Sequence, residues 1–442
     1  MRPSPTEPLY TAEEMRAAEA GHDVEAMMQR AGAAVAEEVA RRFPDARRIA
    51  IHAGGGTNGG DGKIAGELLQ AAGREIVAER PDVIVDALLG TGMKGAPRDE
   101  TAALIEQING AGVPVVAVDI PSGVDASTGE AAGAAVRADV TVTMHGRKVG
   151  LAVAPGRFLA GEVVVADIGL EAGETKHALV TPAILDEVPR RSAGDNKYTS
   201  GHVLVVGGSP GMTGAAALCA RAALRADAGY VTICAPAESV PVLEELVVEA
   251  VKRPLDEVFA AAEKANALAL GPGLGRDPET LALVRRLLAE VEIPAVVDAD
   301  ALFELKPGDW PAPRVLTPHE GELGRLLGRD SKEIAAHRLA SVQEAAEKFN
   351  AVVVLKGEDS LIATPGGHVL VCALGLPSLA TAGTGDVLTG ITAAFLAKGM
   401  EPQRAAAAAC AAQQLASRAA SQRAGLVASD VVDALPTVFA GN

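Results

Sequence analysis

Short aliphatic runs that end in glycine-rich turns and lead into helical patterns recur along the whole of this chain. Alternation of this kind predicts a mainly parallel sheet with helices on both faces. The core must be aliphatic, because hydrophobic residues make up 48% of the chain but aromatic residues only 2%. The 48 glycines also suit an α/β protein with many strand-to-helix turns. A chain of 442 residues should hold two or three domains, each with its own core.

In the first half, residues 11–14 form a capping box, which predicts a long helix that reaches about Phe43. Further helices are expected at residues 61–72 and 101–111. The expected strands lie at residues 48–52, 75–78, 83–87, 113–118, 140–143 and 162–167. A polar, turn-rich segment follows, and we expect a linker near residues 172–192.

The second half starts the alternation again. Its expected strands lie at residues 202–206, 230–235, 267–270, 295–298 and 352–355. Its expected helices lie at residues 215–228, 278–290, 331–349, 385–398 and 402–419. This pattern predicts a second α/β domain.

Charge and cysteine usage limit the partners. The formal charge of −17 argues against nucleic acid and anionic membrane as partners. No apolar stretch is long enough to span a bilayer, and the N-terminus lacks the apolar segment of a signal peptide. The four cysteines form no CxxC pair and are typical of reduced, buried thiols. We therefore expect a cytoplasmic protein that acts on small molecules.

Residues 382–386 (AGTGD) read as a glycine-rich turn that opens a helix and carries Asp386 in its first turn. Unpaired N–H groups and the positive end of the helix dipole make such a turn a site for phosphate. A carboxylate beside phosphate is unfavourable unless it takes a proton from a hydroxyl that attacks phosphorus. The pentapeptide indicates kinase-like chemistry on a small hydroxylated molecule, although taken alone it also fits an ordinary helix start.

A second glycine-rich turn, residues 54–62 (GGGTNGGDG), follows an expected strand and opens an expected helix. Gly54, Gly56 and Gly59 satisfy the GxGxxG pattern, so a nicotinamide-dependent dehydrogenase is one alternative. Asn58 and Asp61 argue against it, because a dinucleotide-binding turn mainly needs bare backbone and a carboxylate would repel a pyrophosphate.

Two further turns, residues 86–95 (DALLGTGMKG) and 118–125 (VDIPSGVD), also carry carboxylates where expected strands end. Open α/β sheets bind ligands at the carboxyl ends of their strands. Asn58, Asp86 and Ser122 could there supply oxygen ligands to a hard monovalent or divalent cation. Each residue singly also fits a turn or capping role, but the three together favour a site.

These three turns resemble the epimerase domain of the NAD(P)H-hydrate repair enzymes, over most of residues 10–170. The resemblance implies a Rossmann-like three-layer α/β/α domain, at residues 1–174, that interconverts the R and S forms of hydrated NAD(P)H at C6. It implies that K⁺ is held by Asn58, Asp86 and Ser122, and our candidates for proton transfer are Asp119 and Lys94. The residues implied to bind the hydrated nucleotide are Thr57, Asn58, Gly59, Gly60, Asp61, Gly90, Thr91, Gly92, Met93, Lys94, Gly95, Ala96 and Asp119.

Six segments of the second half belong together: GGSPGMTGAA, GPGLG, DADAL, TPHEGE, LKG and AGTGD. The first lacks the lysine of a Walker P-loop, so that site is rejected. In this order the segments resemble the ribokinase-like superfamily and, more narrowly, its ADP-dependent NAD(P)H-hydrate dehydratase domain, over about residues 193–438.

That resemblance implies a ribokinase-like α/β domain, at residues 175–442, with ADP as co-substrate and Mg²⁺ on the phosphates. The domain would return the S form of hydrated NAD(P)H to NAD(P)H, with AMP and phosphate as further products. Asp386 would take the proton of the C6 hydroxyl. The residues implied to contact the hydrated dinucleotide are Ala215, Gly273, His319 and Asp386, and those implied to contact the adenine nucleotide are Lys356, Gly357, Glu358, Asp359, Ser360 and Gly385.

The two halves thus fit one repair enzyme, and the resemblance also implies a homo-oligomer. One alternative is a sugar, vitamin or hydroxymethylpyrimidine kinase fused to a Rossmann module. Another is a first domain that only senses dinucleotides. The residues alone do not separate ADP from ATP, nor NADH hydrate from NADPH hydrate.

Overall fold

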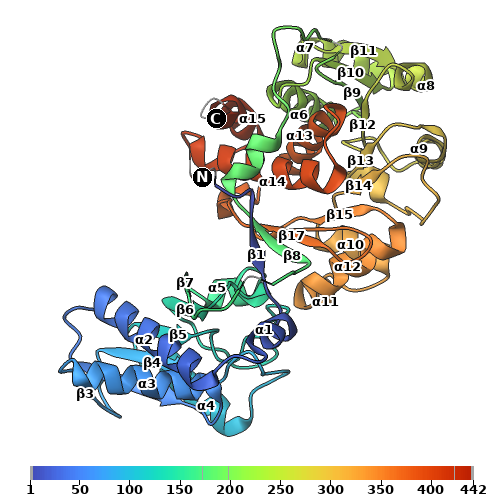
Figure 1. Ribbon diagram of the computed structural model, residues 1–442. Coiled ribbons are helices and arrows are strands. Elements are labelled where there is room, and N and C mark those ends of the chain that lie inside the picture. The colour runs from blue at the N-terminus through green and yellow to red at the C-terminus, as the bar shows by residue number, and fades with distance from the viewer. Residues whose placement is uncertain (1–2, 172, 198, 423, 440–442) are drawn as a thin grey trace. The chain divides into compact units, whose positions relative to one another are not determined.

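Figure 1 shows the computed structural model of the protein, which describes residues 3–171, 173–197, 199–422 and 424–439. The chain divides into two compact units. One consists of residues 8–178, and the other of residues 1–7 together with residues 179–442. Both are α/β units with largely parallel sheets, which confirms the predicted fold class.

The unit of residues 8–178 has six parallel strands in the order β3-β2-β4-β5-β6-β7. The strands are β2 (Arg48–Ala53), β3 (Glu75–Ile76), β4 (Val83–Ala87), β5 (Val115–Val118), β6 (Val140–Met144) and β7 (Glu162–Ala166). The helices are α1 (Ala12–Glu19), α2 (Val24–Arg42), α3 (Thr57–Ala71), α4 (Asp99–Gly110) and α5 (Gly156–Leu159).

Strand β4 shows why this unit has three layers. Val83 and Val85 pack in a buried cluster with residues of α2 and α3, whereas Ile84 packs with Ile105 and Ile108 of α4 on the opposite face. Successive side chains of a strand point to opposite faces, and since every residue of β4 is buried, the strand must be covered on both sides.

The single helix expected at residues 11–43 is wrong, because the chain breaks between α1 and α2. Gly21 adopts φ +83°, and Asp23 then caps α2 by accepting hydrogen bonds from the N–H groups of Glu25 and Ala26. A glycine in the left-handed region followed by an aspartate is a helix stop and a new start.

The other sheet has eleven strands in the order β1-β8-β17-β16-β15-β14-β13-β12-β9-β10-β11, and nine of them lie wholly in the second unit, while β1 and β8 cross the boundary between the units. Pairing is parallel from β11 to β15 and antiparallel from β15 to β17. The strands are β1 (Thr6–Leu9), β8 (His177–Val180), β9 (His202–Val206), β10 (Tyr230–Ala235), β11 (Val251–Pro254), β12 (Ala267–Leu270), β13 (Ala295–Val297), β14 (Arg314–Leu316), β15 (Val352–Leu355), β16 (Ser360–Ala363) and β17 (Val369–Cys372).

The helices of this unit are α6 (Thr213–Arg225), α7 (Val240–Leu246), α8 (Val258–Ala262), α9 (Pro278–Glu290), α10 (Glu320–Leu327), α11 (Ser331–Ala336), α12 (Arg338–Phe349), α13 (Thr384–Ala397), α14 (Pro402–Ala419) and α15 (Ala428–Phe439). Helices α6 and α13 lie side by side against the sheet (Figure 1). One helix was expected at residues 331–349, but His337 leaves the helical region and separates α11 from α12.

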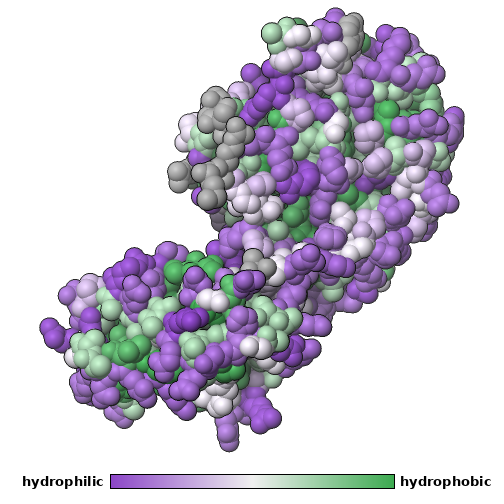
Figure 2. All heavy atoms as spheres, in the orientation of Figure 1, coloured by the Kyte–Doolittle hydropathy of each residue, from purple (hydrophilic) through white to green (hydrophobic). Residues whose placement is uncertain are grey.

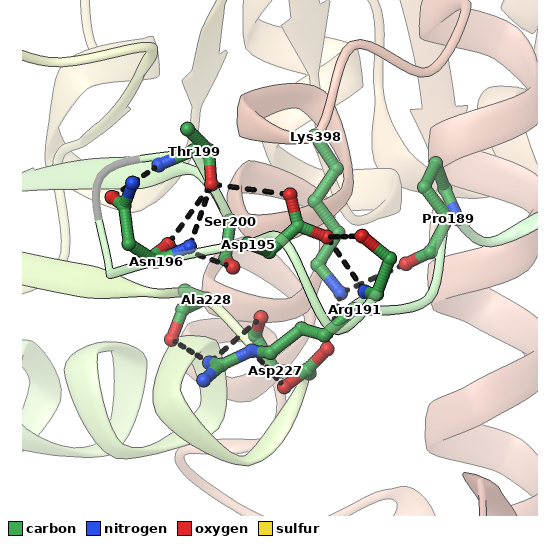
Figure 3. A network of polar contacts seen from close by, with 10 residues as sticks. Pro189, Arg191, Asp195, Asn196, Thr199, Ser200, Asp227, Ala228 and Lys398 are labelled. Atoms are coloured by element: carbon green, nitrogen blue, oxygen red, sulfur yellow. Dashed lines mark hydrogen bonds and ion pairs between the residues drawn. The ribbon is translucent and has the colours of Figure 1, made fainter.

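From residue 179 onward, the segment expected as a linker is part of the second unit. Beyond β8 it forms a 3₁₀ helix at Pro182–Glu187 and then the polar network of Figure 3. Arg191 pairs with Asp227 at 2.7 Å, and Lys398 pairs with the same carboxylate at 2.8 Å. The network lies next to the residues that begin β9 and β10, so it anchors the amino end of this sheet.

In each unit the strand order reverses at one point, between β2 and β4 in the first unit and between β9 and β12 in the second. Such a reversal opens a crevice at the carboxyl ends of the strands. Hydrophilic residues cover most of the face shown in Figure 2. In the described part of the chain, no helix combines the length and the apolarity needed to cross a membrane.

Candidate active sites

The first unit has a cavity of about 500 Å³ at the carboxyl ends of β2, β4 and β5. Of the residues predicted to bind the hydrated nucleotide, those that line it are Thr57, Asn58, Asp61, Gly90, Thr91, Gly92, Met93 and Asp119. Those that do not line it are Gly59, Gly60, Lys94, Gly95 and Ala96. Lys94 is exposed, so the structure does not bring it together with Asp119.

The turn after β2 is itself the first turn of α3, with Gly56 as the N-cap. It passes very close to the preceding chain, because a Cβ on Gly59 would lie 2.0 Å from the carbonyl oxygen of Gly54. Only glycine fits there. This tight start buries Asn58 and Asp61 at the wall of the cavity.

Two of the three predicted potassium ligands, Asn58 and Ser122, bond the backbone of Leu89, and Ser122 links them to the third, Asp86. Asn58 donates from Nδ2 to the carbonyl oxygen of Leu89 at 2.9 Å, and the N–H of Leu89 donates to Ser122 Oγ at 2.9 Å. Ser122 also donates from its N–H and its hydroxyl to Asp86, at 2.8 and 2.7 Å.

Two features of this cluster matter for a cation. Asn58 Oδ1 is buried and has no hydrogen-bond partner in the described structure. Asp86 is fully buried, which raises its pKa to about 6 despite the hydrogen bonds from Ser122. An unpaired amide oxygen and a buried carboxylate are what a hard cation satisfies.

Asp119 stands at the end of β5 with φ +66°, an uncommon conformation for a residue with a side chain. Its Oδ1 accepts hydrogen bonds from Lys148 Nζ at 2.5 Å, from the N–H of Met144 at 3.0 Å and from Thr143 Oγ1 at 3.2 Å. Sequence reasoning missed Lys148. Its signal was only a lysine shortly after an apolar strand, in the segment HGRKVG.

Asp61 and Glu19 add two carboxyl groups to the same cavity. Burial raises the pKa of Asp61 to about 7, and the negative charges of Asp119 and Glu19 add to the effect. Burial also raises the pKa of Glu19 above its ordinary value. Glu19 was not predicted, because it lies at the end of α1, far in sequence from the glycine turns.

The second unit has a cavity of about 480 Å³. The predicted residues that line it are His319, Lys356, Gly357, Glu358, Ser360, Gly385 and Asp386. Asp359 is buried beneath the loop and does not line it. Ala215 and Gly273 lie next to each other at the reversal between β9 and β12, where a Cβ on Gly273 would be 3.2 Å from Ala215 Cβ, and they are not part of its lining.

Asp386 lies in the first turn of α13, after the N-cap Gly383 at φ +88°. Within the described residues, no hydrogen bond or ion pair occupies its carboxylate. Burial raises its pKa to about 7, and the negative charge of Asp298 adds to this, while Lys356 opposes it. Asp386 is thus a carboxyl group, at the positive end of a helix, that has a raised pKa and no hydrogen-bond partner in the described structure, and it is suited to accept a proton.

Lys356 provides the positive charge of this cavity. Its Nζ pairs with Asp298 at 2.8 Å and lies 3.6 Å from Glu322, and a Cβ on Gly385 would be 3.4 Å from it. Burial disfavours the charge, but Asp298 and Glu322 raise the pKa of Lys356 above its ordinary value. Thr389 of α13 donates to the other oxygen of Asp298 at 2.8 Å, which fixes this carboxylate between the helix and Lys356.

Arg338 of α12 anchors the loop of residues 356–360, because it pairs with the buried Asp359 at 3.0 Å and with Glu320 at 2.5 Å.

His319 caps α10, because its Nδ1 accepts hydrogen bonds from the N–H groups of Gly321 and Glu322. Gln413 of α14 also lines the cavity and donates to the carbonyl oxygen of Thr384 at 2.5 Å. Its role was not predicted, since it stands in an alanine-rich helix without a motif.

Comparisons with known proteins address both units. Residues 203–437 match the family described as NAD(P)H-hydrate dehydratase, and residues 24–79 and 73–150 match the YjeF-related protein N-terminus. A bifunctional NAD(P)H-hydrate repair enzyme Nnr from Moorella thermoacetica is 40% identical over 93% of this chain and 92% of its own length. The enzyme of the same description from Pyrobaculum aerophilum is 36% identical over 93% of each chain.

Among solved structures, the ADP/ATP-dependent NAD(P)H-hydrate dehydratase from Bacillus subtilis, crystallised with ATP and Mg²⁺, is similar to this chain with a TM-score of 0.55. It is 29% identical and covers 59% of this chain and 97% of its own. In the described residues, no three His, Cys, Asp or Glu side chains are grouped to hold a metal ion.

Proposed function

The chain belongs to the family of bifunctional NAD(P)H-hydrate repair enzymes, and from this premise we propose how its two cavities divide the reactions. It is an enzyme with an epimerase activity and a dehydratase activity on hydrated NAD(P)H. We assign epimerisation to residues 1–174 and dehydration to residues 175–442. The epimerase then converts the form that the dehydratase does not use into the form that it does.

In the dehydratase, Asp386 takes the proton of the C6 hydroxyl as that oxygen attacks the terminal phosphoryl group of the nucleotide. The P–O bond to AMP breaks, and the N–H groups at the start of α13 hold the charge that develops. The ring nitrogen then expels phosphate from C6, and loss of a proton from C5 restores the double bond. The products are NAD(P)H, AMP and phosphate when ADP is the donor.

The single observation that carries this assignment is Asp386, an unengaged carboxylate at the start of α13, where Gly385 adjoins Lys356. Lys356 and the loop to Ser360 would hold the phosphates of the nucleotide, while His319 and Asp386 would contact the hydrated ring. Ala215 and Gly273 would contact the remainder of the dinucleotide beyond the cavity.

The dehydratase uses an adenine nucleotide with Mg²⁺, as the matched Bacillus subtilis enzyme does. Since no group of three acidic or histidine ligands occurs among the described residues, we propose that the ion is carried by the phosphates. When bound, Mg²⁺ neutralises phosphate charge. The choice of ADP over ATP is part of the proposal.

In the epimerase, we propose that Asp119 accepts the proton of the C6 hydroxyl. The C6–N1 bond then breaks to give an open-chain aldehyde with the proton on N1, and reclosure on the other face gives the second epimer. The oxygen atoms of Asn58, Asp86 and Ser122 fit a potassium ion, because Asn58 Oδ1 is buried without a partner. When bound, the ion would supply positive charge beside the turns that hold the substrate.

The test uses a mixture of R and S NADPH hydrate with ADP and Mg²⁺, and follows the absorbance of NADPH. The enzyme should restore the whole mixture, whereas Asn58→Ala should restore only the S half quickly. Asp386→Asn should restore neither. Full and fast recovery by Asp386→Asn would overturn the dehydratase assignment, and recovery with ATP but not ADP would overturn the nucleotide assignment.

We further propose a cytoplasmic homo-oligomer. The four cysteines are all buried and form no disulfide, which fits a reducing compartment. Light scattering of the purified protein measures the oligomer, and a monomer at micromolar concentration would contradict it.

A further inference from the structure

Lys148 is a buried charged residue of the first unit that no motif explains. It precedes a 3₁₀ helix, Val149–Leu151, and its side chain is 0% exposed. Its Nζ donates to Asp119 Oδ1 at 2.5 Å, to the carbonyl oxygen of Met144 at 2.7 Å and to Thr143 Oγ1 at 3.1 Å. An ammonium group has three protons, so these three acceptors saturate it.

Only one of the two carboxylate oxygens of Asp119 is bound by the described part of the protein. In the described residues, the hydrogen bonds to its side chain all go to Oδ1, from Lys148, Thr143 and Met144. Asp119 nevertheless lines the cavity and keeps 14% of its side chain exposed. One oxygen is therefore fixed to the protein, and Oδ2 is left for the substrate.

A fully buried ammonium is costly to a fold, and an apolar side chain of similar volume often stabilises as well as a buried ion pair does. Stability alone is therefore a weak reason for a lysine at this position. A catalytic role explains the lysine better, because its partner Asp119 is the carboxylate that faces the substrate cavity. Asp119 also has a strained backbone conformation.

We propose that Lys148 is a positioning residue of the epimerase, which fixes Oδ1 of Asp119 and thereby aims Oδ2 at the C6 hydroxyl. This inference rests on the proposed function, since it needs Asp119 as the proton acceptor. Lys148 transfers no proton in this step; the proton that Asp119 takes from the hydroxyl is passed to N1 and returned on ring closure. The exposed Lys94 has no part in this step.

The experiment measures kcat and KM for epimerisation of R-NADPH hydrate by the full-length enzyme. Dehydration of S-NADPH hydrate serves as an internal control, because the second unit holds that site. Lys148→Met should lower kcat about 100-fold and leave KM within about threefold, a loss in the range of general acid–base catalysis. The exposed Lys63→Met is the matched control and should leave both activities unchanged.

A double-mutant cycle separates positioning from folding. If Lys148 acts through Asp119, then Lys148→Met should cost less than about threefold in the Asp119→Asn background, because contacting residues are not additive. A full second loss in that background, or near-normal kcat in Lys148→Met, would overturn the inference alone. Near-normal epimerisation by Asp119→Asn itself would overturn the proposed base and the inference with it.

Thr143→Val provides a second variant if Lys148→Met does not fold. Thr143 Oγ1 bonds both Lys148 and Asp119, and valine has almost the same shape without the hydroxyl. We expect a fall of about tenfold in kcat, less than the roughly 100-fold that a displacement of about 1 Å can cost, because Lys148 and the N–H of Met144 still hold Oδ1. An unchanged kcat would contradict the claim that the anchoring of Oδ1 matters.

Discussion

Replacing Asp386 by asparagine should stabilise the dehydratase unit while it abolishes dehydration. The pKa of Asp386 is raised by burial from 3.8 to about 7 in the folded protein. Well below about pH 4 the carboxyl is neutral in both the folded and the unfolded states, so replacing Asp386 by asparagine gains no stability there. Between about pH 4 and about pH 7 the unfolded state loses the proton of this carboxyl while the folded state keeps it, so stability falls over this range and levels off above about pH 7.

The size of the effect follows from the shift in pKa. A difference of about 3 units at about 1.4 kcal/mol each gives an upper limit of roughly 4 kcal/mol above pH 7. Asparagine has no charge to bury, so Asp386→Asn should recover much of this energy. For a unit of this size, 1 kcal/mol corresponds to roughly 2–4 °C in Tm.

The single tryptophan makes the assay specific. Trp310 lies in the second unit, so its fluorescence follows the unfolding of that unit. Melts of Asp386→Asn and of the parent protein, without nucleotide, should show a small Tm difference at pH 4.5 and a much larger one at pH 8, with the higher Tm for the variant. Dehydration should fall by at least about 100-fold in the variant. A Tm difference that does not grow with pH, or a less stable variant at pH 8, would refute the reasoning.

Three further outcomes are expected. Lys356→Met should lower the free energy of unfolding by about 3–5 kcal/mol, because it leaves Asp298 as a buried charge without its partner. Adding Asp298→Asn should recover part of this loss, as measured in Trp310 melts. Equal stability of the single and double variants would contradict the pairing. Gly59→Ala should abolish epimerisation and spare dehydration, since a Cβ there meets backbone at 2.0 Å, whereas Gly110→Ala, which has open space, should change neither rate. Epimerisation should be faster in potassium chloride than in choline chloride, and Asn58→Ala should remove that difference; a difference that persists would exclude Asn58 as a ligand.

The fold class and most central strands were predictable from sequence, because glycine turns between aliphatic runs leave few alternatives to a parallel sheet. The antiparallel strands β16 and β17 were not predicted, although Gly366 and Gly367 form a turn between them. Their short apolar runs carry no period that separates a strand from other buried segments. The breaks at Gly21 and His337 were missed because the helical pattern continues on both sides of them.

The chemistry of the sites divides in the same way. The sequence by itself determined where backbone must bend tightly and where a carboxylate follows a strand, since those demands are local: Asp386, Asn58 and Asp119 all came from turns. Only the tertiary structure decided which charged side chains form ion pairs with each other. Lys148 reaches Asp119 across 29 residues, and Lys356 reaches Asp298 across 58, because the strands of a parallel sheet bring their carboxyl ends to one edge. Burial at that edge, which raises the pKa of Asp386 to about 7, is likewise a property of the packed fold and of no single segment.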